Sequence, residues 1–177
     1  AYRAEVLEKI LPASSVRIVN EAKQAGAVTA ICSATYSYAT QPSAELFGVD
    51  YLLSVRPQKD QSGNFTGRWI EPITYQQGKV TAVEKLVDEL KRQGTTIDEY
   101  EFWSDSEADL ALFEYVDKKG GRCCVVNARE TLLRIASERG WHVTDSYTQA
   151  EYDFAAQLVA KALANRENAP RLLRKSK

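Results

Sequence analysis

The chain has 177 residues, of which 44% are hydrophobic and 27% are charged, and this balance is typical of a globular domain with a buried core. Its formal net charge of −1 gives no electrostatic argument for a nucleic-acid or membrane partner, and no apolar run is long enough to cross a bilayer. The three cysteines, two of them adjacent, do not form a disulfide framework and indicate buried thiols in a reducing, cytoplasmic compartment.

The first half of the chain predicts a helix, a buried strand and a hairpin. The helix ends before Gly26, and residues 27–32 then form a continuous apolar run of strand length. Residues 51–56 and 65–70 are strand-like and flank the turn-forming sequence DQSGN, which predicts a β-hairpin.

The second half alternates helices and strands. We expect helices at residues 80–94, 107–116, 127–140 and 150–164, and strands at 99–103, 122–126 and 141–144. This alternation predicts an α/β fold, with a Rossmann-like three-layer α/β/α core, a mainly parallel sheet and the β-hairpin. In such sheets ligands bind outside the carboxyl ends of the strands, which is where functional residues are expected.

Polar residues follow the first predicted strand. Ser33 and Ala34 come directly after the apolar run, where a hydroxyl and free backbone N–H groups can hold a phosphoryl oxygen. The alternative interpretation is that Ser33 caps the next helix, a common role for serine.

Lys79 lies at the start of the helix predicted at residues 80–94, where its charge opposes the helix dipole. This unfavourable placement suggests a nearby anion, although a solvated surface lysine is the simpler interpretation. A phosphate-binding P-loop is excluded, because GxxxxGK[ST] needs a glycine at Ile73 and a hydroxyl at Val80.

Two acids lie just beyond the strand predicted at residues 99–103. Asp105 and Asp109 are one helical turn apart, so both can face one point, as ligands of Mg2+ do. The alternative is that Asp105 caps the helix and that Asp109 is a first-turn acid favoured by the helix dipole.

The order of these groups resembles the haloacid dehalogenase superfamily, in particular its phosphoserine-phosphatase-like branch. The sequence AICSATYSYATQPSAELFGVDYLL is similar to the second motif and the following helix, and SGNFTGRWIEPITYQQGKV to the hairpin and the motif lysine. The sequences FWSDSEADLALFEYV and VVNARETLLRIASERGWHV resemble the acidic motif and the closing strand and helix. The resemblance implies residues 1–12 as the end of a helical cap segment, 13–148 as the core, and 149–177 as a C-terminal helix and basic tail.

Members of this family hydrolyse phosphomonoesters through an aspartyl-phosphate. By resemblance, Ser33 and the Ala34 N–H would bind the phosphoryl group of a small phosphorylated metabolite, and Lys79 would pair with that group and the nucleophile. Asp105 and Asp109 would hold Mg2+. Several carboxylates packed against a phosphate repel strongly, so a dication and a lysine are physically required partners.

The family's nucleophile motif, hhhDxDx[TV], does not occur in the sequence, and methionine is absent. We therefore expect that Ala1 is not the translated start, that most of the cap and the nucleophile strand precede it, and that this chain alone is inactive. Ala108 also departs from the family, in which an asparagine often precedes the second acid.

Two alternatives to a phosphatase remain. The first is a non-enzymatic relative that binds a phosphate ligand and lacks the nucleophile. The second is a receiver-like signalling domain, which ranks last because Lys79 precedes Asp105 in the chain.

Overall fold

The computed structural model describes residues 13–144. The expected cap segment at 1–12 and the expected C-terminal helix and tail at 149–177 lie outside these residues. In chain order the elements are α2 (Ala13–Gln24), β1 (Ala30–Tyr36), α3 (Ser37–Phe47), β2 (Tyr51–Lys59), β3 (Phe65–Ile70), α4 (Gln77–Arg92), β4 (Glu101–Ser104), the 3-10 helix η2 (Glu107–Asp109), α5 (Leu110–Lys118), β5 (Arg122–Val126), α6 (Glu130–Arg139) and β6 (His142–Thr144).

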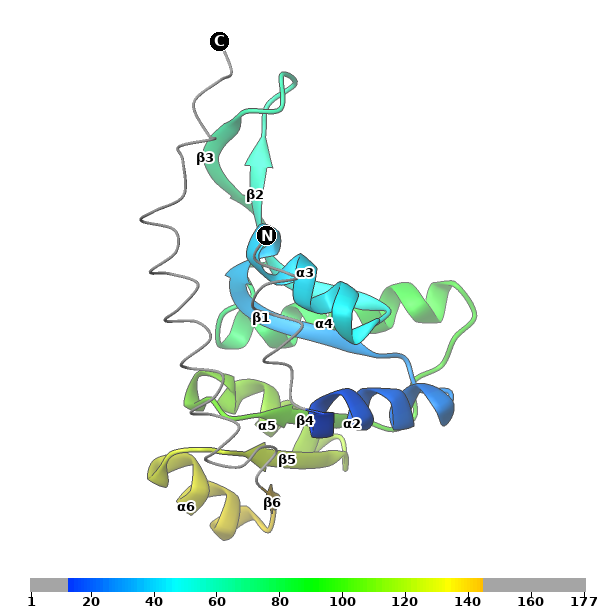
Figure 1. The fold of residues 1–177 in the computed structure, drawn as a ribbon, viewed down its shortest axis with the longest axis vertical. Helices are drawn as coiled ribbons and strands as arrows, with labels where there is room; N and C mark the ends of the chain where they lie inside the picture. The colour runs from blue at the N-terminus through cyan, green and yellow to red at the C-terminus, as the bar shows by residue number, and fades with distance from the viewer. Residues whose placement is uncertain (1–12, 145–177) are drawn as a thin grey trace.

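The strands form two three-stranded sheets (Figure 1). In the first, β1 pairs with β2 in parallel, and β2 pairs with β3 antiparallel as the predicted hairpin. In the second, β4, β5 and β6 are all parallel. The α/β class, the parallel pairing and the hairpin are thus confirmed. The expected sheet is divided, however, and within the described residues β1 and β4 each have a ladder on one side only.

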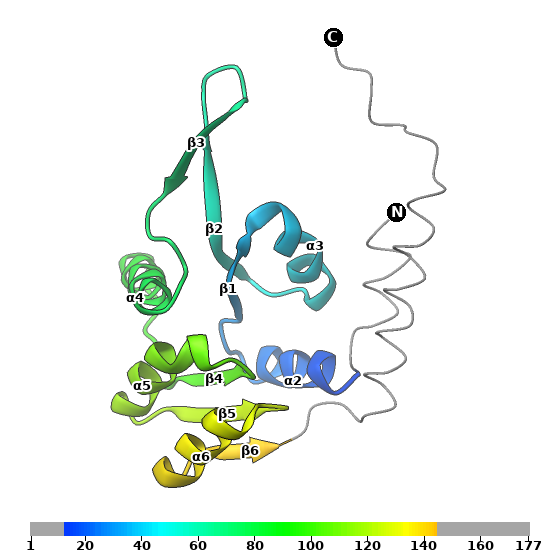
Figure 2. The same ribbon diagram turned by 90° about the vertical axis from the view of Figure 1, so that its left-hand side faces the viewer.

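The helices cover both faces of the first sheet. Figure 2 shows α3 and α4 on opposite sides of β1 and β2, and both helices contact these strands. The apolar face of α4 explains its position, because Val80, Ala82 and Leu90 are buried there. Helix α4 also packs against α5. This contact joins the first sheet to the second, because α4 lies on β1 and β2 and α5 lies on β4 and β5.

The main hydrophobic core surrounds β5. Phe113 stacks on Trp141 with ring centroids 5.1 Å apart and meets Phe102 edge-on at 4.8 Å. Val125 and Leu132 are fully buried in the same cluster. The core therefore packs α5 and α6 against β5. It also holds β4 in place, because Phe102 of β4 packs against Phe113.

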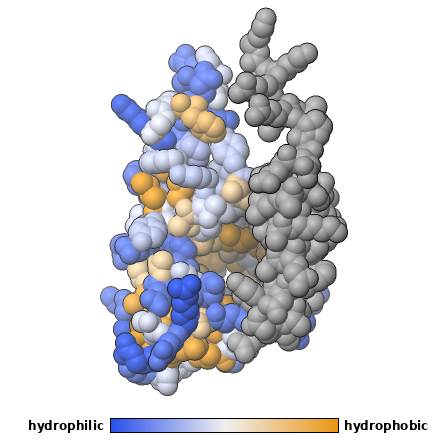
Figure 3. All heavy atoms as spheres, turned by 60° about the vertical axis from the view of Figure 1, so that its left-hand side comes forward, coloured by the Kyte–Doolittle hydropathy of each residue, from blue (hydrophilic) through white to orange (hydrophobic). Residues whose placement is uncertain are grey.

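Exposed aromatic residues of strand β3 of the hairpin contact others at the end of β1 and the start of α3. The Tyr36 ring stacks on Trp69 at 5.2 Å, and Tyr38 meets Phe65 edge-on at 5.5 Å. All four side chains are substantially exposed. Hydrophobic side chains also show at the surface in Figure 3. None of the helices within residues 13–144 combines the length and apolar character needed to cross a bilayer.

Candidate functional site

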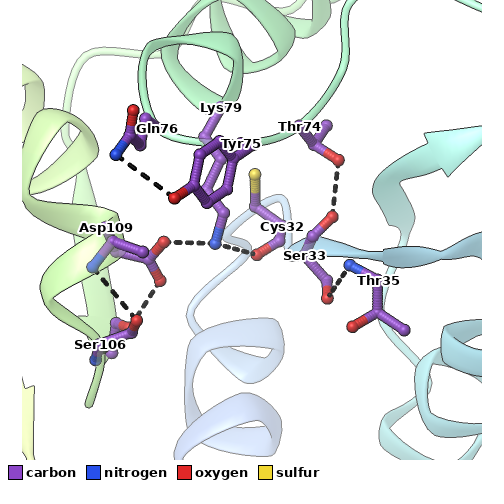
Figure 4. Close-up of polar contacts among 11 residues, drawn as sticks. Cys32, Ser33, Thr35, Thr74, Tyr75, Gln76, Lys79, Ser106 and Asp109 are labelled. Atoms are coloured by element: carbon purple, nitrogen blue, oxygen red, sulfur yellow. Dashed lines mark hydrogen bonds and ion pairs between the residues drawn. The ribbon is translucent and has the colours of Figure 1, made fainter.

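Lys79 lies at the centre of the candidate site (Figure 4). It sits in the first turn of α4, where only 5% of the residue is exposed, so it is not a solvated surface lysine. Its Nζ donates to the Cys32 carbonyl oxygen at 3.2 Å and forms an ion pair with Asp109. Lys79 therefore connects the end of β1 in the first sheet with the start of α5, next to the second sheet.

Asp109 is held from two sides. It ends η2 and precedes α5, and only 6% of the residue is exposed. One carboxylate oxygen, Oδ1, faces Lys79, and the other, Oδ2, accepts a hydrogen bond of 2.7 Å from the Ser104 hydroxyl at the end of β4. A buried carboxylate needs such partners, because an unpaired charge in the interior is strongly unfavourable.

The end of β1 is irregular, and this differs from the prediction. The strand continues to Tyr36, whereas the apolar pattern predicted its end at residue 32. Ser33 is paired with Ser54, and the next pair is Tyr36 with Val55, so Ala34 and Thr35 lie in a bulge outside the register. Bulges often occur beside active sites, because they turn backbone groups away from the ladder.

Ser33 does not cap α3. The N-cap residue of that helix is Tyr36, and the Ser33 hydroxyl accepts instead from the Thr35 N–H at 3.1 Å. The capping alternative raised by the sequence is therefore wrong. Ser33 stays within the strand end, with its hydroxyl beside the bulge.

The loop between β3 and α4 also contacts the end of β1. Thr74, which is 2% exposed, donates from Oγ1 to the Ser33 carbonyl oxygen at 2.6 Å. The loop is folded tightly, since a Cβ at Gly78 would lie 1.8 Å from the Ile73 carbonyl oxygen. Thr74 was not expected from the sequence, because no motif or spacing distinguishes it from an ordinary loop threonine.

Asp105 is placed differently from Asp109. Its residue is exposed, and within residues 13–144 no hydrogen bond or ion pair involves its side chain. Ser106 caps η2 in its place, with Oγ accepting from the Ala108 N–H at 3.3 Å, so the alternative that Asp105 is the cap is wrong. The Asp105 carboxylate is thus available to a ligand.

The described residues contain no group of three or more His, Cys, Asp or Glu side chains that could hold a metal ion. A closed, all-protein metal cage is therefore not present in this part of the chain. Mg2+ does not need one, because it usually takes one or two carboxylates and fills its other positions with water and substrate phosphate oxygens. The exposed Asp105 carboxylate could serve as such a ligand, whereas both Asp109 oxygens already face partners, Oδ1 the Lys79 ammonium and Oδ2 the Ser104 hydroxyl.

A cleft opens beside the buried pair, between the start of α4 and the start of α5. Its lining includes Ala108, whose methyl group cannot form a hydrogen bond. The other lining residues are Gln76, Gln77, Glu107, Leu110, Ala111 and Glu114.

Cys32 adjoins the site but is not suited to act as a nucleophile. Burial raises the pKa of its thiol to about 11, although the nearby Lys79 charge lowers it in part. The thiol is therefore protonated at neutral pH, and only the thiolate is strongly nucleophilic.

The structure brings three sequence-predicted segments together: the end of β1 with Ser33, the start of α4 with Lys79, and the start of α5 with Asp109. A tightly folded, partly parallel α/β fold carries these groups at the carboxyl ends of β1 and β4, where ligands bind in such folds. This arrangement defines the class of protein as an α/β fold with a charged site at the carboxyl ends of its parallel strands.

The chain belongs to the haloacid dehalogenase-like hydrolase family, whose model matches residues 1–114. It is 28% identical over 148 residues to a histidinol-phosphatase of Neisseria meningitidis serogroup C (strain 8013), covering 80% of this chain and 64% of that protein. It is also 28% identical over 141 residues to the "Inhibition of morphological differentiation protein" of Streptomyces azureus, covering 80% of this chain and 48% of that protein.

Solved structures share the fold. A Bordetella pertussis Tohama I protein of unknown function superimposes with a TM-score of 0.73 at 31% identity, covering 82% of this chain and 63% of that one. A substrate-bound phosphoserine phosphatase superimposes with a TM-score of 0.52 at 22% identity, covering 73% and 56%. The chain thus spans less than two thirds of the length of each of these relatives.

Proposed function

We propose that this chain is part of a Mg2+-dependent phosphatase that hydrolyses a small phosphorylated metabolite through an aspartyl-phosphate. The observation that carries the proposal is the buried Lys79, which contacts both the Cys32 carbonyl and Asp109. A lysine held in this way supplies fixed positive charge at a strand end, and phosphoryl transfer depends mainly on positioning and charge neutralisation.

The nucleophile would come from a strand that precedes this chain in the full-length protein. We place this strand between β1 and β4, each of which has a ladder on one side only within residues 13–144. Its carboxyl end would then present an aspartate beside Lys79. This placement accounts for the absence of an hhhDxDx[TV] motif from the sequence.

In this mechanism each residue of the chain has a separate role. The Ser33 hydroxyl and the Ala34 N–H bind phosphoryl oxygens, and Lys79 neutralises charge on the phosphoryl group and orients the attacking carboxylate. A carboxylate oxygen attacks phosphorus while the bond to the leaving alcohol breaks, and water later hydrolyses the acyl phosphate. Asp105 and Asp109 would hold Mg2+, which supplies further positive charge against the phosphoryl oxygens when bound.

Relatives support the substrate class at the level of a phosphomonoester. The Neisseria relative is named a histidinol-phosphatase, and the structural neighbours include phosphoserine phosphatases. Ala108 removes the hydrogen bond that an asparagine would offer in the cleft, so we expect the substrate range and efficiency to differ from those of a phosphoserine phosphatase.

The test uses the full-length protein and an aryl phosphate. We expect release of inorganic phosphate, its loss on addition of EDTA and its recovery on addition of Mg2+. Asp105→Asn should lower kcat/KM by about 100-fold or more, because the carboxylate ligand is lost. Asp98→Asn, an exposed acid before the amino end of β4, is the matched control and should keep nearly full activity.

Two outcomes would contradict the proposal. Equal activity of the wild type and Asp105→Asn would remove Asp105 from the metal site. Tight binding of inorganic phosphate without any turnover would instead favour the non-enzymatic phosphate-binding relative.

A further inference from the structure

The peptide group between Ser33 and Ala34 is fixed by a side chain that no motif identifies. Thr74 is buried and donates to the Ser33 carbonyl oxygen at 2.6 Å, across 41 positions of the sequence. Lys79 donates to the preceding carbonyl, that of Cys32, at 3.2 Å. The segment from Thr74 to Lys79 therefore holds two consecutive peptide groups of β1.

The loop that carries Thr74 has little freedom to move. Gly78 has no space for a Cβ against the Ile73 carbonyl, so only glycine allows the loop to close this tightly. Within the loop, the Tyr75 N–H donates to Ile73 and the Gly78 N–H donates to Tyr75. Gln76 has a φ of 45°, a conformation that residues other than glycine adopt only when their surroundings impose it.

Peptide planarity carries this constraint to the next N–H. The Ser33 carbonyl and the Ala34 N–H belong to one planar trans peptide group, so they point in opposite directions. Figure 4 shows the Ser33 carbonyl directed at Thr74 and the Ser33 hydroxyl directed to the other side. The Ala34 N–H therefore points to the same side of β1 as the Ser33 hydroxyl. The bulge has removed Ala34 from the ladder with β2.

A hydrogen bond to the carbonyl also changes the donor strength of the N–H. It polarises the amide, and hydrogen bonds linked through one peptide group strengthen each other. Thr74 thus both orients the Ala34 N–H and makes it a better donor toward an anion.

We propose that Thr74 is a positioning residue that sets the Ala34 N–H to bind a phosphoryl oxygen. The proposal rests on the proposed function, and it adds a residue that touches neither substrate nor metal. Thr74 acts only through the Ser33–Ala34 peptide group, so its hydroxyl is needed and its methyl group is not.

The experiment compares three variants of the full-length protein. Thr74→Val keeps the shape and loses the hydroxyl, and Thr74→Ser keeps the hydroxyl. Thr81→Val is the matched control, because the Thr81 hydroxyl donates to Gln77 within α4 and not to β1. Thermal unfolding of each variant is measured beside its activity.

We expect Thr74→Val to lower kcat/KM by about 10- to 100-fold through lost positioning. Inhibition by orthovanadate, which mimics the transition state, should weaken by about tenfold or more, and inhibition by inorganic phosphate should weaken less. Thr74→Ser should restore both within about threefold, and Thr81→Val should leave both unchanged. Wild-type kinetics in a folded Thr74→Val variant would overturn the proposal.

A second readout does not depend on turnover or on the folding of Thr74→Val. In ¹⁵N-labelled wild-type protein, titration with inorganic phosphate should shift the Ala34 amide signal strongly, and Thr74→Ser should preserve that shift. If titration with phosphate does not shift the Ala34 amide signal, the assignment is overturned. If the wild type binds phosphate at Ala34 but shows no turnover, the proposed function fails and the positioning role of Thr74 stands.

Discussion

At the scale of single residues, the Lys79–Asp109 ion pair decides whether the site can exist. Both side chains are more than nine-tenths buried. Removal of water from two charges is costly, and their attraction offsets this cost only while both partners are present. Each side chain has a further partner, the Cys32 carbonyl for Lys79 and the Ser104 hydroxyl for Asp109.

We predict that Lys79→Met lowers the free energy of unfolding by about 3–5 kcal/mol, because it leaves the Asp109 carboxylate buried without its cation. The double variant Lys79→Met/Asp109→Leu should recover most of that loss. Lys85→Met, an exposed lysine of the same helix, is the control and should change stability by less than about 0.5 kcal/mol. Urea unfolding followed by circular dichroism measures all three, and equal effects of Lys79→Met and Lys85→Met would contradict the burial argument.

At the scale of elements, the sequence pattern identifies the segments but not the details of their ends. The apolar face of α4 is visible in the sequence as helical spacing of apolar residues, and β5 as the continuous run RCCVV, because a strand buried on both faces has apolar residues at successive positions. The bulge at Ala34 and Thr35 and the hydrogen bond from Thr74 are not visible, because both depend on contacts between segments far apart in the chain. Ser106 occupies the capping position that the alternative interpretation assigned to Asp105, and the sequence does not decide between them because either residue type can cap a helix.

The loop before α4 gives a prediction at this scale. Gly78→Ala should lower the free energy of unfolding by about 3 kcal/mol, because the new Cβ collides with the Ile73 carbonyl and the loop must open. Gly94→Ala is the control: its φ is 89° in open space, so the cost is about 1–2 kcal/mol of local strain.

A second readout separates the two glycine variants. Opening the loop displaces Thr74, so the amide signals of residues 32–35 should shift in Gly78→Ala and stay in place in Gly94→Ala. A Gly78→Ala protein with unchanged signals at residues 32–35 would show that the loop does not position the end of β1.

At the scale of the whole molecule, the division into two sheets is the main structural fact to explain. Helices α4 and α5 pack together and the Lys79–Asp109 ion pair crosses between the two halves, yet β1 and β4 are joined by no ladder within the described residues. An open strand edge presents unpaired N–H and C=O groups, which favour pairing with another strand. One inserted parallel strand would satisfy both edges and complete a continuous sheet.

Hydrogen exchange tests this insertion directly. In the chain of residues 1–177, we expect the edge-facing amides of β1 and β4 to exchange quickly, because no strand within residues 13–144 pairs with these edges. In the full-length protein the same amides should be protected by about 100-fold or more, as amides in a central ladder are. The amides of β5 are the internal control, since β5 is paired on both sides by β4 and β6 and should be protected in both proteins. Fast exchange of the β1 and β4 amides in the full-length protein would place the nucleophile strand elsewhere. Slow exchange of these amides in the shorter chain would mean that another segment of that chain already pairs with the two edges.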